Sequence, residues 1–407
     1  MVNNKSKAFA LKMKEVSRKV FTPNVVATLI SIAIGILLGF VILFISNPRH
    51  SFQGLGAILI GGFANKMKGI GQTLYLATPL ILTGLAVGFS FKAGQFNIGA
   101  SGQFLVGGFV AIYIGVKWTF LPGALHWIVA ILGAAVAGAL WGALPGLLKA
   151  FYRVSEVIST ILFNFVAMYV VNMLIMMTVY HSALNETKDV AKSAELPTWF
   201  LRDLFSNKIG SYVDKSTISI GIFIAIFIAI IVYFIISKTR FGFEIKACGY
   251  NPDAAKASGM NVRKNIVLAM AISGALAGIG GALLFLSGPT GRHIKVVETI
   301  PAEGFTGLSV ALLGSSHPIG IIFTALFISH ITMSGQKLQS LNYISEIINI
   351  IIGVIIFFSG FSMIIQQNIG KIKTFFKFKK KGNTEELPVE EATEESVVES
   401  TEKGELK

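Results

Sequence analysis

Cysteine is almost absent from this sequence, because Cys248 is the one cysteine among 407 residues. A disulfide framework within the chain is therefore excluded, and so is a metal site built on paired cysteines. The histidines do not supply a metal site either, because they are scattered over different predicted loops and spans; they are His50, His126, His181, His293, His317 and His330. We expect this chain itself to bind no metal and no cofactor.

Two further absences restrict the mechanism. No G-x-x-x-x-G-K-[ST] segment occurs, so the chain does not bind and hydrolyse ATP through a P-loop. The acidic residues Glu156, Glu303 and Glu346 all lie at the ends of predicted spans, and a relay of buried acids, typical of proton-driven carriers, is missing. This disfavours an ion-coupled secondary transporter or a channel that works alone, but both stay open as alternatives.

Charged residues are scarce as well. They make up 14% of the chain, whereas soluble domains average about 25%. Hydrophobic residues make up 53%, the mean hydropathy is +0.69, and 42 glycines suit closely packed membrane helices. The net charge of +14 gathers at segment ends, which indicates orientation in a membrane rather than binding to nucleic acid. The composition predicts an all-α integral membrane protein whose surroundings are a lipid bilayer.

About ten apolar segments are candidates for transmembrane helices. They cover residues 25–45, 73–89, 104–116, 124–148, 156–180, 218–236, 266–286, 304–313, 319–333 and 344–365. We expect short or broken helices near 91–116 and 304–318, because polar residues and a Gly-Ser-Ser-His-Pro run interrupt the apolar pattern there. Spans one to five start inside and spans six to ten start outside, which is the pattern of an inverted repeat of two five-helix halves.

The charged ends predict the orientation of the chain. Residues 1–23 form a basic N-terminus, and 367–407 form a tail that turns from basic to acidic and is too charged to fold. Both ends are therefore expected in the cytosol of a bacterial cell, flanking a transmembrane domain over 24–366. Residues 181–215 then form an external loop and residues 238–265 a cytosolic loop.

The cytosolic loop contains a short helix with a signal at each end. Asn251 is a good N-cap, Pro252 suits the first helical position, and Asp253 favours the helix dipole. Gly259 can take the left-handed conformation that ends a helix. The residues that we expect to carry the function of this helix are Asn251, Pro252, Asp253, Ala254, Ala255, Ala257, Ser258 and Gly259. An ordinary capped loop helix is the alternative.

Uncharged polar side chains gather near the first predicted break. Asn97, Ser101 and Gln103 follow one another there, and Thr160 and Asn164 lie on the fifth span. Irregular backbone at membrane depth survives inside protein or along a cavity. We expect these residues to line the pathway of a polar, neutral solute; the alternative is hydrogen bonding between helices.

One enzymatic interpretation also arises at this break. Gly99-Ala100-Ser101-Gly102 matches the G-x-S-G pattern of rhomboid-type intramembrane proteases, and His330 lies in a later span. A serine with a histidine partner would be an activated nucleophile. The pattern is short and the chain is rich in glycine, so we interpret the chain as a transport subunit and not as an enzyme.

Five ordered segments resemble a known family. They read FNIGASGQ, EVISTILFNF, TRFGFEIKACGYNPDAAKASGMNV, SGALAGIGGAL and GFTGLSVALLG. The sequence resembles the inner-membrane permeases of bacterial ABC importers for branched-chain amino acids, ribose-type sugars and nucleosides. It is most similar to the nucleoside and simple-sugar group, although Ser101 stands where an acidic residue is expected in that group.

The resemblance implies a function for the whole chain and for its capped loop. The loop would be the coupling helix that docks in a groove of a separate cytosolic ATPase subunit, which binds the ATP. A second permease, identical or homologous, and an extracellular solute-binding lipoprotein would be further partners. The resemblance implies a nucleoside or related polar solute, with a sugar or a branched-chain amino acid as the alternative.

Overall fold

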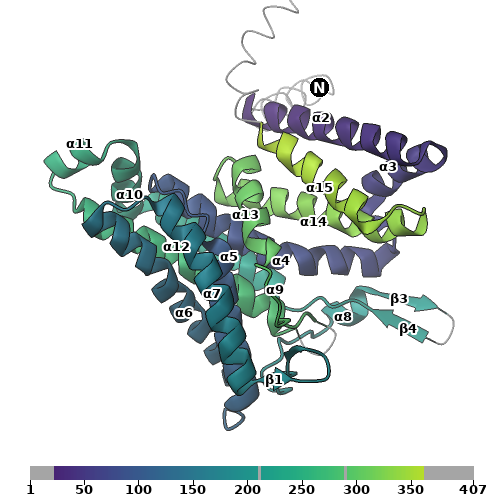
Figure 1. Ribbon diagram of the computed structural model, residues 1–407, viewed down its shortest axis with the longest axis horizontal. Helices are drawn as coiled ribbons and strands as arrows, with labels where there is room; N and C mark the ends of the chain where they lie inside the picture. Colours follow the sequence, from purple (N-terminus) through teal and green to yellow (C-terminus); the bar gives the residue numbers. More distant parts are fainter. Residues whose placement is uncertain (1–22, 210–211, 288–290, 362–407) are drawn as a thin grey trace, which may run out of the picture.

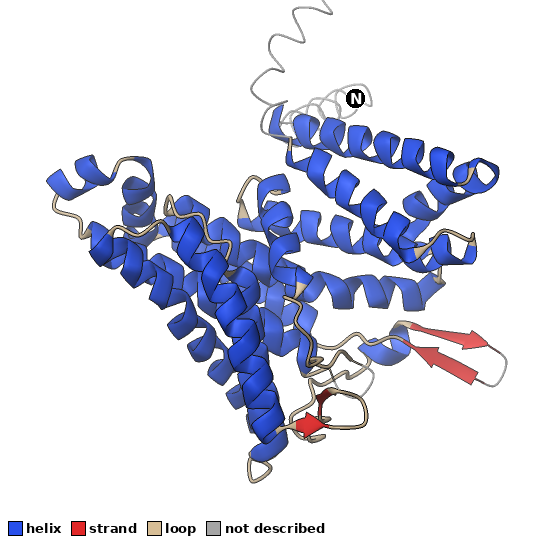
Figure 2. Cartoon of the chain, in the orientation of Figure 1, coloured by secondary structure: helices blue, strands red, loops and turns tan. Residues whose placement is uncertain are grey.

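The computed structural model describes residues 23–209, 212–287 and 291–361, which form a set of long helices with two small hairpins (Figures 1 and 2). Residues 1–22 of the predicted basic N-terminus (1–23) and the whole predicted tail (367–407) lie outside the described residues. The elements are α2 (Pro23–Ser46), η1 (Pro48–His50), α3 (Ser51–Ile60), η2 (Gly61–Phe63), α4 (Lys66–Lys92), α5 (Ala100–Lys117), α6 (Gly123–Tyr152), α7 (Glu156–Thr178), β1 (Tyr180–His181), β2 (Glu186–Thr187), α8 (Leu201–Leu204), β3 (Ser206–Ile209), β4 (Tyr212–Lys215), α9 (Gly221–Lys238), α10 (Arg240–Tyr250), α11 (Pro252–Ala257), α12 (Val262–Phe285), α13 (Ala302–Leu313), α14 (Pro318–Ser340) and α15 (Ser345–Gly360).

The all-α architecture is confirmed, and a helix stands at each of the ten predicted apolar segments. Among the described residues, eight helices are long and apolar enough to cross a membrane, namely α2, α4, α5, α6, α7, α9, α12 and α14. Two further apolar helices, α13 and α15, are shorter. The third span starts earlier than the predicted 104–116, because α5 has 18 residues and begins at Ala100. Its polar first turn is tolerated because it lies inside the protein.

The centre of the fold is held by backbone contact between α5, α6 and α12. A Cβ built on Gly107 would lie 2.3 Å from the Cα of Gly278, and one on Gly278 would lie 2.4 Å from the carbonyl oxygen of Ala134. A Cβ on Gly138 would lie 2.3 Å from the carbonyl oxygen of Gly274. No side chain fits between these helices, so glycine is required where they cross.

A second, smaller core lies apart from this centre. It joins α2, α3, α14 and α15 through buried apolar residues that include Leu43, Ile58, Ile331, Leu338 and Ile351. The hydroxyl of Tyr343 donates to the carbonyl oxygens of Leu43, at 3.3 Å, and Asn47, at 3.1 Å. The first and last described helices therefore pack against each other, as Figure 1 shows.

Both predicted interruptions are present in the backbone. The chain leaves α4 at residue 92, and Gly94 has a φ of +68° in the turn before α5. After α13, Ser315 and Ser316 have φ values of 54° and 51°, a left-handed conformation that is rare outside glycine. The first turns of α5 and α13 meet, because a Cβ on Gly304 would lie 2.3 Å from the backbone nitrogen of Ser101. The inverted repeat itself stays a prediction.

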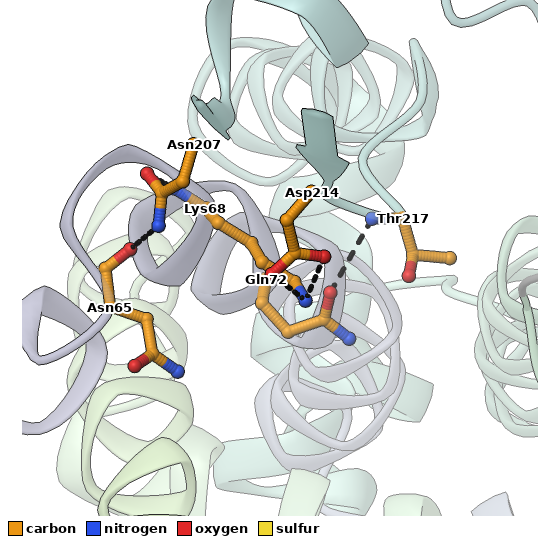
Figure 3. A network of polar contacts seen from close by, with 6 residues as sticks. All are labelled: Asn65, Lys68, Gln72, Asn207, Asp214 and Thr217. Atoms are coloured by element: carbon orange, nitrogen blue, oxygen red, sulfur yellow. Dashed lines mark hydrogen bonds and ion pairs between the residues drawn. The ribbon is translucent and has the colours of Figure 1, made fainter. Parts of the chain in front are cut away.

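The loop at 181–215 is more ordered than its polarity indicated. It contains β1 and β2 and, after α8, the hairpin of β3 and β4, which projects from the helices (Figure 2). Figure 3 shows how the hairpin is fastened to the start of α4. The Lys68 ammonium lies 2.7 Å from both carboxylate oxygens of Asp214, and Asn207 Nδ2 donates to the Asn65 carbonyl oxygen at 2.7 Å.

The glycine contacts lead to a prediction about stability. Replacing Gly278 with Ala places a methyl group against α6 and should cost about 1–3 kcal/mol, as overpacking does in other cores. Thermal unfolding of the detergent-purified protein should therefore shift downward by several degrees. Gly56→Ala is the control, because nothing lies within 4 Å of a Cβ built there. Equal melting curves for both variants would contradict the close packing of α6 and α12.

Candidate functional site

The polar residues near the first break bind one another. Asn97 Nδ2 donates to Gln103 Oε1 at 3.0 Å and to Ser273 Oγ at 2.8 Å, and the Ser273 hydroxyl donates to the Ala86 carbonyl oxygen at 2.6 Å. Asn97 Oδ1 also accepts from the backbone nitrogen of Gly99 at 2.9 Å. This amide joins α4, α5 and α12 at the point where the backbone is irregular.

Asn164 makes the matching connection from α7. Its Oδ1 accepts from the backbone nitrogen of Gly102 at 2.8 Å, and its Nδ2 donates to the carbonyl oxygen of Ile98 at 3.1 Å. Thr160 donates to the Glu156 carbonyl oxygen of its own helix at 2.6 Å. Asn164 therefore satisfies backbone groups that the break leaves without helical partners.

That these residues line a pathway stays a prediction. Asn97, Ser101, Gln103, Thr160 and Asn164 are each at most 1% exposed, and none of them lines the five best-formed cavities of the described residues. The alternative, hydrogen bonding between separate elements, accounts for three of the five, namely Asn97, Gln103 and Asn164, while Thr160 bonds within its own helix. Sequence could not decide this, because the same amides serve both purposes.

Ser101 is the exception within this group. Its hydroxyl is buried and has no hydrogen-bond partner among the described residues. His330 does not approach it, because Gly62 N donates to His330 Nδ1 at 3.2 Å and His330 Nε2 lies 3.1 Å from the Leu59 carbonyl oxygen. The described residues therefore contain no Ser101–His330 pair of the protease type.

A cavity that the sequence did not reveal lies beside the start of α13, and we call it the outer vestibule after the predicted external loop at 181–215, which contributes Glu186 to its lining. Its volume is about 520 Å³. Leu105, Leu284 and Phe285 supply apolar lining from α5 and α12. The rest of the lining comes mostly from the segment between α12 and α13, and consists of Asn172, Glu186, Gly291, Arg292, His293, Ile294, Lys295, Val297, Thr299, Pro301 and Glu303.

Ion pairs and backbone hydrogen bonds hold the wall of the vestibule. Arg292 Nη1 donates to Glu303 Oε1 at 2.5 Å. His293 lies between two carboxylates, with Nδ1 3.4 Å from Glu186 and Nε2 3.0 Å from Asp189. The backbone of Thr187 donates to the Ile294 carbonyl oxygen at 3.0 Å, so this wall is fastened to the loop that begins after α7. The sequence had pointed to Glu303 as an acid at a span end and to His293 as one of six scattered histidines, but not to their shared cavity.

A second cavity, of about 530 Å³, is lined largely by the segment that follows α7, between residues 192 and 217. Lys192, Glu195 and Arg202 line it together with Trp127 of α6. Burial raises the pKa of the Glu195 carboxyl, while the charges of Lys192 and Arg202 oppose this shift. The segment between α7 and α9 therefore borders two cavities with polar lining.

The loop between α9 and α12 lies at the opposite end of α6, α7 and α12 from β1 (Figure 1). Its predicted caps are present. Asn251 Oδ1 accepts from the backbone nitrogens of Asp253, at 3.1 Å, and Ala254, at 3.0 Å, and Pro252 starts α11. Gly259 has a φ of +83°, and Ser258 forms the C-cap. The sequence prediction missed α10, whose N-cap Thr239 accepts from Gly242 N at 3.0 Å.

One residue of the loop does not lie where a docking helix would need it. Ala255 is 3% exposed and packs inside this chain, so it does not present its methyl group to a partner. The exposed positions of α11 are Pro252, Asp253, Ala254, Lys256 and Ala257. Cys248 is also buried, and Asn265 Nδ2 lies 3.4 Å from its sulfur, so the native thiol is shielded.

Comparison with known proteins identifies the family. The model for the permease component of branched-chain amino acid transport systems matches residues 69–360. The chain belongs to this permease family. The match begins after α3 and includes both breaks, the outer vestibule and the capped loop, so this permease is a multi-pass membrane protein.

Named relatives of the permease are ABC transporter proteins. The guanosine ABC transporter permease protein NupP of Bacillus subtilis is 36% identical over 86% of this chain and 97% of its own length. The nucleoside ABC transporter permease protein NupB of Lactococcus lactis is 34% identical over 91% of this chain and 99% of its own. The glucose ABC transporter permease protein TsgB13 of Haloferax volcanii is 29% identical over 77% and 81%. No solved structure matches the chain.

The placement of the loops predicts a pattern of chemical labelling. In a Cys248→Ala background, a cysteine at the exposed Ala257 of α11 should react with an impermeant maleimide only after the membrane is opened. A cysteine at the exposed Ala183, between β1 and β2, should react in intact cells. Labelling of the Ala257 position from outside would reverse the orientation. The unmodified chain should label weakly in both conditions, because Cys248 is buried.

Proposed function

We propose that this chain is a membrane subunit of an ATP-binding-cassette importer that carries nucleosides into the cell. The observation that carries the proposal is the near full-length similarity to two permeases whose names specify guanosine and nucleosides. The glucose permease is less similar and shares a smaller part of the chain, which favours a nucleoside over a sugar.

The geometry supports the division of labour that such an importer needs. The chain has no P-loop, so a separate cytosolic ATPase must bind and hydrolyse the ATP. The exposed face of α11 is the proposed contact for that ATPase. The polar cavities at the other end are the proposed entry for a solute delivered by an extracellular binding lipoprotein. A second permease, identical or homologous, completes the proposed assembly, with both termini of this chain in the cytosol.

Uptake measurements test the proposed function. Cells that carry the gene should accumulate radiolabelled guanosine faster than cells from which it has been deleted, and depletion of ATP should abolish the difference. Glucose and leucine uptake, measured in the same cells, distinguish the sugar and amino acid alternatives. Equal uptake of every nucleoside by the two strains would contradict the proposal. Flux through the purified permease in liposomes without an ATPase would favour a carrier or channel.

The coupling role of α11 leads to a separate prediction. Ala257→Glu adds a charge and bulk to the exposed face of α11, so the ATPase should co-purify less and uptake should fall at least severalfold. Gly259→Val places a β-branched residue at a φ of +83° and should distort the end of α11 with a similar loss of uptake. Both variants leave the spans unchanged, so their amounts in the membrane should stay normal.

The matched control is the same substitution at the other end of the molecule. Ala183→Glu also replaces an exposed alanine with glutamate, but in the loop between β1 and β2. It should leave co-purification of the ATPase unaffected. If Ala257→Glu binds the ATPase and transports as the unaltered protein does, α11 is not the coupling element.

A further inference from the structure

The outer vestibule has the dimensions and lining of a small-molecule site. Its volume of about 520 Å³ lies within the range of about 300–1,000 Å³ that is typical of ligand pockets. Such pockets combine apolar walls with a few well-placed polar groups. Here Leu105, Leu284 and Phe285 supply the apolar wall.

Glu303 is an acid whose backbone the fold holds firmly at this cavity. It lies in the first turn of α13, and the next residue, Gly304, packs directly on the backbone of Ser101. The Glu303 side chain is 17% exposed, whereas that of its partner Arg292 is 51% exposed. Close packing thus fixes the backbone that carries the carboxylate, while the arginine approaches from the more open side.

The charges that line the cavity favour an uncharged solute. The two carboxylates of its described lining each lie beside a basic side chain, Glu303 beside Arg292 and Glu186 beside His293. A negatively charged solute would be repelled by Glu303 and Glu186, and a positively charged solute by Arg292 and Lys295. A neutral solute rich in hydroxyl groups avoids both repulsions, and its hydroxyls can donate hydrogen bonds to a paired carboxylate.

We infer that the outer vestibule recognises the ribose of the transported nucleoside, and that Glu303 accepts hydrogen bonds from its 2′- and 3′-hydroxyls. The inference rests on the proposed function. An ionised carboxylate has two acceptor oxygens and suits a pair of neighbouring hydroxyls, as acidic residues on ribose do in dinucleotide-binding folds. Arg292 orients the carboxylate through Oε1, and the base lies toward the apolar wall of the cavity.

The test compares guanosine with 2′,3′-dideoxyguanosine, which lacks both hydroxyls. Initial uptake rates of the two labelled compounds are measured in deletion cells that express either the unaltered chain or Glu303→Gln. The preference for guanosine, expressed as the ratio of kcat/KM values, should fall about tenfold in the variant, because a hydrogen bond to a charged group is lost. The extracellular binding lipoprotein is the same in both strains, so its own preference between the two compounds cancels when the strains are compared.

Two variants make the result specific. Glu303→Asp keeps the charge but withdraws the carboxylate by one methylene, so the preference should fall in the same direction. Asp203→Asn removes another ion pair of the outer loop, in which Lys215 lies 2.8 Å from Asp203, and Asp203 does not line the vestibule. It should leave the preference unaltered. Immunoblots of the membrane fraction confirm equal amounts of each protein.

The outcomes separate this inference from the proposed function. If Glu303→Gln slows both compounds equally, Glu303 only supports the fold and does not recognise ribose. An unchanged preference in both Glu303 variants would also overturn the inference, while guanosine uptake by the unaltered chain would still support the proposed function. If the unaltered chain moves neither compound, the proposed function fails and the ribose site fails with it.

Discussion

The structure depends on hydrogen bonds that satisfy a broken backbone inside the membrane-spanning region. Between α4 and α5 the chain runs without helical hydrogen bonds, and unpaired backbone groups at such a depth cost several kcal/mol each. The side-chain amides of Asn97, in the segment before α5, and of Asn164, on α7, supply the missing hydrogen-bond partners. Once these bonds are made, α5 can begin close to α12, and the glycine contacts at Gly107 and Gly278 follow.

The same break sets the position of the outer vestibule. Gly304 packs on Ser101, so the start of α13 is placed by the start of α5. Leu105, one turn beyond Ser101, and Glu303, one residue before Gly304, both line the cavity. The irregular backbone and the cavity are thus two consequences of one arrangement, in which two helix starts meet and leave room on one side.

Much of the fold could be predicted from sequence because its signals are local. Apolar length placed the spans, and Asn251, Pro252 and Gly259 fixed the ends of α11 through interactions within a few residues. The functional positions were harder to predict. Whether Asn97 faces a cavity or Ser273, and whether Ala255 faces a partner or its own chain, depends on elements far away in sequence. The vestibule could not be predicted, since it joins residues from α5, α7 and the segment between α12 and α13.

The separate core of α2, α3, α14 and α15 has a consequence for biosynthesis. The first of these helices emerges from the ribosome long before α15, yet a Cβ on Gly35 of α2 would lie 2.9 Å from the carbonyl oxygen of Ile355. The helix must therefore remain in the bilayer without α15 until about 300 further residues have been synthesised, since α2 ends at Ser46 and α15 begins at Ser345. The sequence of α2 is stable in lipid without a protein neighbour, because α2 is the most apolar of the eight candidate spans in the described part of the chain. Lipid surrounds α2 until α15 packs against it.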